Sequence, residues 1–168
     1  CKNSDKSVSL DVAHAGCGAL IKSGHEHGRN LAVAHYYRAN AYRDKGELDR
    51  AAADYEQYVK LEPKMSAAFI SRGNIHRRRG DHDRAIAGYS PAIAIHPTPA
   101  VLSARAFEFT RTGDSGRALA DYTHVIKLDA KNASAHLHRG IIHRNRNELD
   151  RALADLDTGT DDHVLQAH

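Results

Sequence analysis

Two stretches of the chain match each other 34 residues apart and decide the fold: GELDRAAADYEQYVKLEP at residues 46–63 and GDHDRAIAGYSPAIAIHP at residues 80–97. The residues that recur between them are Gly46 and Gly80, Ala51 and Ala85, Tyr55 and Tyr89, and Pro63 and Pro97. The pattern continues further along the chain, because Ala118 follows Ala85 after 33 residues and Ala152 follows Ala118 after 34. A fixed period of this length predicts an array of repeated units.

Each period predicts two helices joined by a tight turn. The segment 32–45 is rich in Ala, Tyr and Arg, and Gly46 supplies the left-handed residue with which a helix commonly ends. Asp49 then lies near the start of a second helix, where a carboxylate favours the helix dipole, and Pro63 ends that helix. In the fourth copy Asn147 stands at the position of Gly46, and Asn is the next most suitable residue for the left-handed conformation.

Three places depart from this pattern. Pro91 lies inside the second helix of the second copy, where it removes a hydrogen bond, so we expect a kink or an early helix end there. In the third copy the sequence Asp114-Ser115-Gly116 predicts a weak helix start. In the fourth copy Leu156 replaces the aromatic residue, and we expect the last helix to fray near Asp157.

The pattern resembles that of the tetratricopeptide repeat family, whose helix-turn-helix unit carries small, aromatic, Ala and Pro residues at fixed offsets. The residues that carry the resemblance are Ala39, Tyr42, Gly46, Ala51, Tyr55 and Pro63 in the first copy, and Gly73, Gly80, Ala85, Tyr89, Ala92 and Pro97 in the second. The resemblance covers about residues 32–160, in copies at 32–65, 66–98, 99–132 and 133–160, with residues 161–168 as a C-terminal tail. It implies an all-α fold, a right-handed α-solenoid of antiparallel helix pairs.

Residues 1–31 form a leader in which Leu10–Ser23 is predicted to be a further helix. This helix looks like the lone second helix of a degenerate repeat, and we expect it to cap the array. Cys1 and Cys17 are the only cysteines; they form a disulfide bond if the protein is exported and stay free thiols in a reducing cytosol, where Cys17 is simply a small buried residue. The Ala-rich repeats resemble bacterial arrays. Together with the cysteine pair, they favour a periplasmic or secreted location over a cytoplasmic one.

Composition and charge exclude several classes of protein. The chain has 168 residues, of which 41% are hydrophobic and 27% charged, a globular composition. No apolar run approaches the roughly 20 residues of a membrane-spanning helix, so we expect no membrane insertion. The net charge of +3 is small and the basic residues are interleaved with acidic ones, so we expect no nucleic-acid partner.

The resemblance implies a binding site, because the family binds extended peptides in a concave groove lined by the first helix of every repeat. The candidate groove residues are Tyr36, Asn40, Arg43, Asn74, Arg77, Arg78, Phe107, Arg111, Ile141 and Arg144. The Asn side chains are suited to bonding a peptide backbone or carboxylate, and the Arg side chains to pairing with acidic groups. The alternative is that these Arg residues pair with acidic neighbours of the same chain and are structural or simply solvated.

Other recurring side chains indicate packing. One register position holds an arginine in every copy, and we expect each guanidinium to reach a carboxylate of the neighbouring repeat while the stem covers apolar surface; these residues are Arg38, Arg72, Arg105 and Arg139. His76 and His143 occupy an inward position that Tyr42 and Phe109 fill in the other copies, so we expect them in the core.

The sequence offers no constellation for catalysis or metal binding. The spacings of His136, His138 and His143 do not fit two ligands on one helix face, and His25-Glu26-His27 is weak as a metal site. We find neither a nucleophile elbow nor a phosphate-binding glycine loop, and we expect no cofactor, no metal and no enzymatic activity.

The sequence therefore predicts a non-catalytic protein–protein interaction module, which binds an extended or acidic peptide segment of a protein partner and acts as an adaptor or assembly factor. The alternative is a self-associating structural module that oligomerises through its terminal repeats.

Overall fold

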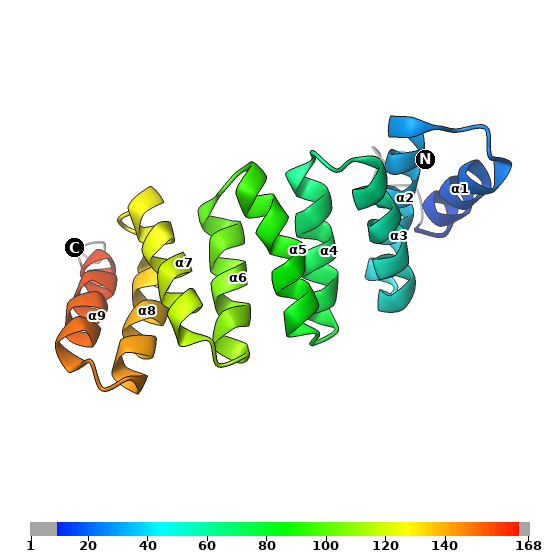
Figure 1. Ribbon diagram of the computed structural model, residues 1–168. Helices are drawn as coiled ribbons and strands as arrows, with labels where there is room; N and C mark the ends of the chain where they lie inside the picture. The colour runs from blue at the N-terminus through cyan, green and yellow to red at the C-terminus, as the bar shows by residue number, and fades with distance from the viewer. Residues whose placement is uncertain (1–9, 165–168) are drawn as a thin grey trace. The chain divides into compact units, whose positions relative to one another are not determined.

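The computed structural model describes residues 10–164 and, within that range, the side chains of residues 15–158. The helices of this part of the chain are, in order, α1 Leu10–Ser23, α2 Gly28–Asp44, α3 Leu48–Leu61, α4 Ser66–Arg78, α5 His82–Ile95, α6 Pro99–Arg111, α7 Ser115–Leu128, α8 Ala133–Asn145 and α9 Leu149–Val164 (Figure 1). The described residues contain no strand, and the all-α prediction is confirmed. None of the described helices is long and apolar enough to cross a membrane.

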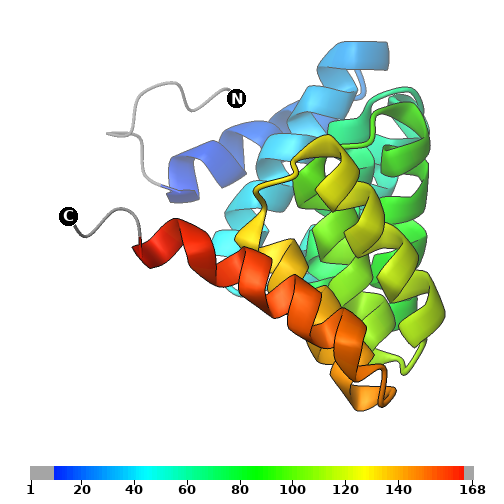
Figure 2. The ribbon, with the colours of Figure 1, turned by 90° about the vertical axis from the view of Figure 1, so that its left-hand side faces the viewer.

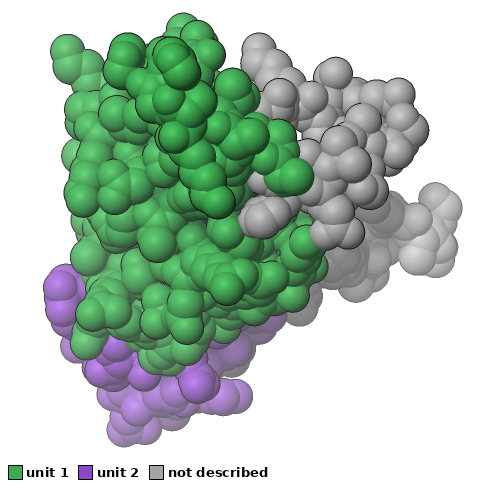
Figure 3. Space-filling view, turned by 90° about the vertical axis from the view of Figure 1, so that its right-hand side faces the viewer, with its two compact units in different colours: residues 1–95 green, residues 96–168 purple. Residues whose placement is uncertain are grey.

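The chain divides into two compact units, Cys1–Ile95 and His96–His168, which Figure 3 distinguishes by colour. In unit 1, α2 packs against α3 and α4 against α5 as helix pairs; α1 packs on the first pair, and α3 joins the two. In unit 2, α6 packs against α7 and α8 against α9, and α7 joins the two pairs. Figure 2 shows α9 lying alongside α8. Each unit is thus a stack of helix pairs, as the repeat period predicts.

The core repeats with the sequence period. The small residues that recur in it at one register position are Ala51, Ala85, Ala118 and Ala152, and the recurring aromatic residues are Tyr55, Tyr89 and Tyr122, all of them buried. The turns between paired helices are also equivalent, because Gly46, Gly80 and Gly113 have φ values of 79°, 74° and 81°, and Asn147 has φ 61°. Asn147 is therefore left-handed, as its position predicts.

The expected weak points of the helices are stronger than predicted. Asp114 is the N-cap of α7 and accepts from the backbone N–H of Arg117 at 2.9 Å, so the third turn is well capped. The helix α5 continues through Pro91 to Ile95 without ending early. Pro91 leaves the carbonyl of Ala87 without its helical donor, and Ala87 is exposed, so water can satisfy that group.

The ends of the array also differ from prediction. The helix α9 continues to Val164 rather than fraying near Asp157. The helix α2 begins at Gly28, ahead of the expected start at residue 32.

The helix α1 has the predicted bounds, and Cys17 is fully buried on it. Cys17 occupies the register of Ala51, 34 residues earlier, which supports the interpretation of α1 as the second helix of a degenerate repeat. Cys1 lies outside the described residues, and its pairing with Cys17 stays a prediction.

His76 and His143 are buried, as predicted. Among the described residues no group bonds Nδ1 of His76, and its Nε2 lies 4.0 Å from Oε1 of Glu56. Burial lowers the pKa of His76, and the nearby acidic groups do not offset this effect. The native protein therefore holds His76 neutral at a pH where the unfolded chain binds a proton, so His76 reduces stability as the pH falls below about 6.5.

Replacing His76 by Phe, the residue that fills this position as Phe109, is expected to remove this contribution. We expect the free energy of unfolding to fall less between pH 7.5 and pH 5.5 in His76→Phe than in the wild type, because the other titrating groups are common to both proteins. Urea denaturation at the two pH values measures the difference. Equal losses in the two proteins would contradict a depressed pKa at His76.

Candidate peptide-binding surface

Unit 1 contains a pair of equivalent tyrosine–asparagine hydrogen bonds. The hydroxyl of Tyr55 on α3 donates to Oδ1 of Asn40 on α2 at 2.7 Å, and the hydroxyl of Tyr89 on α5 donates to Oδ1 of Asn74 on α4 at 2.8 Å. Burial raises the pKa of Tyr55 to about 12, so its hydroxyl keeps its proton and donates at every physiological pH.

These bonds fix both asparagine side chains in one orientation. Because Oδ1 is occupied, the two hydrogens of each Nδ2 group remain as donors. No acceptor for Nδ2 of Asn40 or Asn74 occurs among the residues that the structure describes, and both side chains are only half-buried. The first helices of two successive repeats therefore each present a positioned amide donor.

Tyr36 lies on the same helix as Asn40 and is held by aromatic packing. Its ring centroid is 5.2 Å from that of Tyr58 and 6.3 Å from that of Tyr55, both on α3. The neighbouring Tyr37 ring is 5.3 Å away in an edge-on arrangement. Packing against these rings thus orients the Tyr36 side chain, which lies one helical turn before Asn40.

The candidate cations of unit 1 differ in how far they are already paired. Arg43 binds Asp44, with Nη2 and Oδ1 2.8 Å apart, and its carbonyl oxygen accepts from Nη1 of Arg78 at 3.3 Å. Arg77 is exposed and pairs with no carboxylate in the described part of the chain. Arg43 thus pairs with an acidic neighbour, as the structural alternative predicts, whereas Arg77 is solvated.

Unit 2 carries a different set of residues at the same register positions. Phe107 on α6 is 42% exposed, and Ile141 on α8 is half-buried, so amide donors are replaced by apolar groups. Arg111 and Arg144 are exposed and have no carboxylate partner among the described residues. The hydroxyl of Tyr122 has no asparagine opposite it, because Phe107 holds the register position of Asn40 and Asn74.

The repeated arginines bind within their own repeat, a pattern that sequence analysis missed. In three copies the guanidinium forms a two-pronged bond to an aspartate on the second helix of the same repeat; the pairs are Arg38 with Asp54, Arg105 with Asp121 and Arg139 with Asp155, at 2.6–2.8 Å. The carboxylate that these three arginines bind thus lies in their own repeat, and the prediction that it lies in the neighbouring repeat was wrong for them. It holds for Arg72, whose Nη1 donates to Glu56 of the preceding repeat at 3.3 Å.

The sequence contains a signal for these two-pronged arginine–aspartate bonds, which we call forks. The aspartates directly precede Tyr55, Tyr122 and Leu156 and recur in register with the arginines, whereas the second copy has Gly88 at that position. In the first and last repeats a histidine completes the group: Nδ1 of His35 lies 2.8 Å from Asp54, and Nδ1 of His136 lies 3.1 Å from Asp155. These buried clusters hold the paired helices together.

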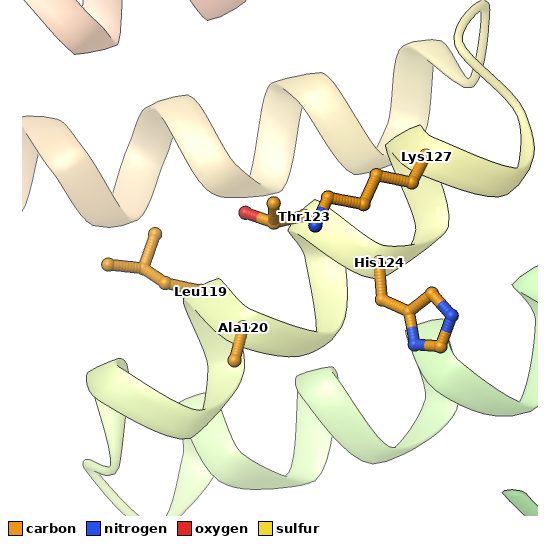
Figure 4. Close-up of a pocket in the computed structure, with 5 residues that line it drawn as sticks. All are labelled: Leu119, Ala120, Thr123, His124 and Lys127. Carbon is orange, nitrogen blue, oxygen red and sulfur yellow. The ribbon is translucent and has the colours of Figure 1, made fainter.

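A further depression runs along α7, with a volume of about 520 Å³ (Figure 4). All of its lining side chains come from that helix; they are Leu119, Ala120, Thr123, His124 and Lys127. The Thr123 hydroxyl already accepts from Nη1 of Arg139 at 3.2 Å. Its lining includes one cationic side chain, Lys127, and no polar groups from a second helix of the described part of the chain face it, so we assign it no role. Among the described residues no group of three His, Cys, Asp or Glu side chains is placed to hold a metal ion.

The fold and its repeated registers define a helical-repeat protein built from stacked pairs. The family model for the tetratricopeptide repeat matches residues 36–98 and 104–161, and the chain belongs to this family.

Solved structures of the same fold include MamA, which is 16% identical over 94% of this chain and 91% of its own, with a TM-score of 0.83. MamA 41-end from Desulfovibrio magneticus RS-1 is 13% identical over 95% and 97% of the two chains, with a TM-score of 0.75. YrrB, described as a TPR protein with an unusual peptide-binding site, is 19% identical over 88% and 75%, with a TM-score of 0.72. Comparison with curated protein sequences gave no match. At these identities the likeness shows the fold.

Proposed function

We propose that this protein is a non-catalytic interaction module that binds an extended peptide segment of a partner protein across α2 and α4, acting as an adaptor or assembly factor. The observation that carries the proposal is the pair of amides, Asn40 and Asn74, each oriented by a buried tyrosine. An extended peptide presents backbone carbonyl groups at regular intervals, and positioned amide donors are suited to bind them. The description of YrrB as a peptide-binding member is consistent with this use of the fold.

The exposed arginines favour a partner segment with acidic side chains. Arg77 and Arg78 lie on the same helix as Asn74, and Arg77 has no competing carboxylate among the described residues. An acidic peptide can therefore bond to an amide through its backbone and to a guanidinium through a side chain. Unit 2 by itself offers the exposed Phe107 as an apolar contact, and Arg111 and Arg144 as cations that have no carboxylate partner among the described residues.

The test separates the amide donors from the packing that orients them. Asn40→Asp and Asn74→Asp keep the oxygen that accepts from the tyrosine hydroxyl but replace both donor hydrogens with a second acceptor. We expect the double variant to lose at least about tenfold in affinity for the partner that the wild type captures from native extract, since one buried donor contributes about 1–3 kcal/mol. Quantitative capture at two salt concentrations measures the loss.

The matched control is Asn30→Asp, because Asn30 is exposed near the start of α2 and makes no contact that the amide pair requires. Its binding is expected to equal that of the wild type. Replacement of Arg43, Arg77, Arg78 and Arg144 by Glu is expected to abolish capture and to remove its salt dependence. Unchanged capture by the Asn40→Asp/Asn74→Asp protein would overturn the proposal.

Self-association is the second candidate function, and one observation favours it. Leu149 and Leu153 lie one turn apart on α9 and are 56% and 60% exposed, although this helix has the same register as α7, which packs against a following helix. A second copy of the chain can cover these leucines. Sedimentation at several concentrations distinguishes the two functions, since a monomer at high concentration excludes self-association.

The periplasmic or secreted location remains our proposal, and it depends on the pairing of Cys1 with Cys17. Free thiols in protein purified from its native compartment would contradict it.

A further inference from the structure

A small cavity of about 420 Å³ lies between α1 and α2 in unit 1, away from the amide pair. Its lining side chains are Ala15, Gly18, Ala19 and Lys22 on α1, and Arg38 and Tyr42 on α2. The small residues of α1 leave the space open, and both charged residues in the lining are cations.

Arg38 is one of the four arginines that recur at the same register position. The hydrogen bonds of its equivalents show which acceptor Arg38 lacks. In the second repeat Nη1 of Arg72 donates to Glu56, and in the fourth repeat Nη1 of Arg139 donates to Thr123. Each acceptor lies 16 residues before its arginine, on the second helix of the preceding repeat. The fold thus provides an acceptor for this nitrogen from the preceding helix.

In the first repeat the preceding helix is α1, and the residue 16 positions before Arg38 is Lys22. An ammonium group has no lone pair to offer, so Lys22 cannot replace Glu56 or Thr123. Nε and Nη2 of Arg38 donate to Asp54, each at 2.7 Å, but no acceptor for Nη1 occurs in the part of the chain that the structure describes. The Arg38 side chain is 19% exposed, so this nitrogen can be reached from the cavity.

The charge balance of the cavity favours an anion. Among the described residues, the one carboxylate that pairs with Arg38 is Asp54, and it is already shared with His35. Lys22 is exposed and has no ion pair among the described residues. An uncompensated ammonium and an unused guanidinium hydrogen-bond donor therefore line the same cavity.

We propose that the cavity between α1 and α2 binds the carboxylate group of a peptide, with Lys22 and Nη1 of Arg38 as its ligands. The bound carboxylate takes the place that the Glu56 side chain fills beside Arg72. The two possible sources are a peptide C-terminus and an Asp or Glu side chain, which share this chemistry. The proposal does not depend on peptide binding across α2 and α4.

Three synthetic peptides test the site on the full chain. Acetyl-Ala-Ala-Ala-Ala carries only a terminal carboxylate, acetyl-Ala-Ala-Glu-Ala-amide carries only a side-chain carboxylate, and acetyl-Ala-Ala-Gln-Ala-amide carries neither. NMR titration of isotope-labelled protein is expected to shift the backbone signals of Ala15, Gly18 and Ala19 with at least one of the first two peptides and with neither at high salt. The third peptide is expected to leave these signals unchanged.

The decisive variant is Lys22→Glu, which supplies from within the chain the acceptor that Glu56 provides in the second repeat. It is expected to weaken binding of the carboxylate peptides by about tenfold or more while raising the melting temperature, because the new carboxylate pairs with Arg38. Lys22→Gln removes the charge without supplying a carboxylate and is expected to weaken binding less. Lys60→Glu makes the same change in net charge on the exposed side of α3 and serves as the matched control.

Full binding by Lys22→Glu would overturn the proposal, as would equal shifts with the Gln peptide. Shifts confined to α2 and α4 that Asn40→Asp/Asn74→Asp removes would also overturn it, and would assign carboxylate binding to the amide surface. Loss of binding at α1 with intact binding at the amide pair supports the cavity alone.

Discussion

Gly88→Ala is expected to lower the free energy of unfolding by about 3 kcal/mol or more, the upper end of the range for overpacking a core. A Cβ at residue 88 would lie 2.6 Å from Cα and 2.8 Å from the backbone N of Gly73. Both atoms belong to the backbone of α4, so no side-chain rotation relieves the clash and the paired helices α4 and α5 must separate. Urea denaturation followed by circular dichroism measures the loss.

Gly116→Ala is the matched control for this prediction. Gly116 also lies within a helix, but a Cβ there would meet nothing nearer than 3.7 Å, at the Asp114 side chain. Replacing a helical glycine in open space is expected to stabilise the protein by about 0.5–1 kcal/mol. If Gly88→Ala were as stable as Gly116→Ala, the close backbone approach of α4 and α5 would be excluded.

Asp155→Asn is expected to destabilise unit 2 by about 3 kcal/mol at neutral pH, because it removes the negative partner of a largely buried guanidinium. The Asp155 carboxylate accepts from Nε and Nη2 of Arg139 at 2.8 and 2.6 Å and lies 3.1 Å from Nδ1 of His136. An amide can accept only one of the two prongs and carries no charge.

The pH dependence of this effect has a defined sign. Burial by itself would raise the pKa of Asp155, but the hydrogen bonds from Arg139 and His136 outweigh it and hold the pKa below its ordinary value. A carboxylate with a lowered native pKa adds stability above the pKa of the unfolded chain, near 3.9, and loses that contribution as the pH falls through the native value.

The difference in unfolding free energy between wild type and Asp155→Asn is therefore expected to be constant above about pH 5 and to shrink below about pH 4. The exposed Asp150, on the same helix, provides the control, and Asp150→Asn is expected to change stability by less than about 0.5 kcal/mol at every pH. A difference that stays constant down to pH 2 would show that the fork does not lower the pKa of Asp155.

Gly88 and Asp155, the residues of these two predictions, occupy the same register position of their repeats. Three repeats hold an aspartate there and form the fork, while the second repeat holds Gly88 and brings the backbones of its two helices into contact. Without an aspartate beside it, Arg72 binds Glu56 of the preceding repeat. The second repeat therefore has closer helix packing in place of the buried ion pair, and its arginine binds a carboxylate of the preceding repeat.

The period of the sequence determined most of the fold. The spacing of Ala51 and Ala85, of Tyr55 and Tyr89, and of the turn residues predicted the helix pairs, because small and aromatic residues recur wherever two helices must pack in the same way. The bounds of α1 followed from its apolar face. The left-handed turn at Asn147 followed from its place in the period.

Tertiary structure alone decided which polar groups meet. These contacts depend on distances between helices, which periodicity does not specify. Examples are the hydrogen bond by which Tyr55 orients Asn40, the pairing of Arg139 with an aspartate of its own repeat, and the unused donor of Arg38 beside Lys22. An arginine stem is long enough to reach either neighbouring helix, so its partner is set by which carboxylate the packed backbones bring within about 3 Å. The sequence determined the registers of these side chains, and the packing of the helices selected the contacts between them.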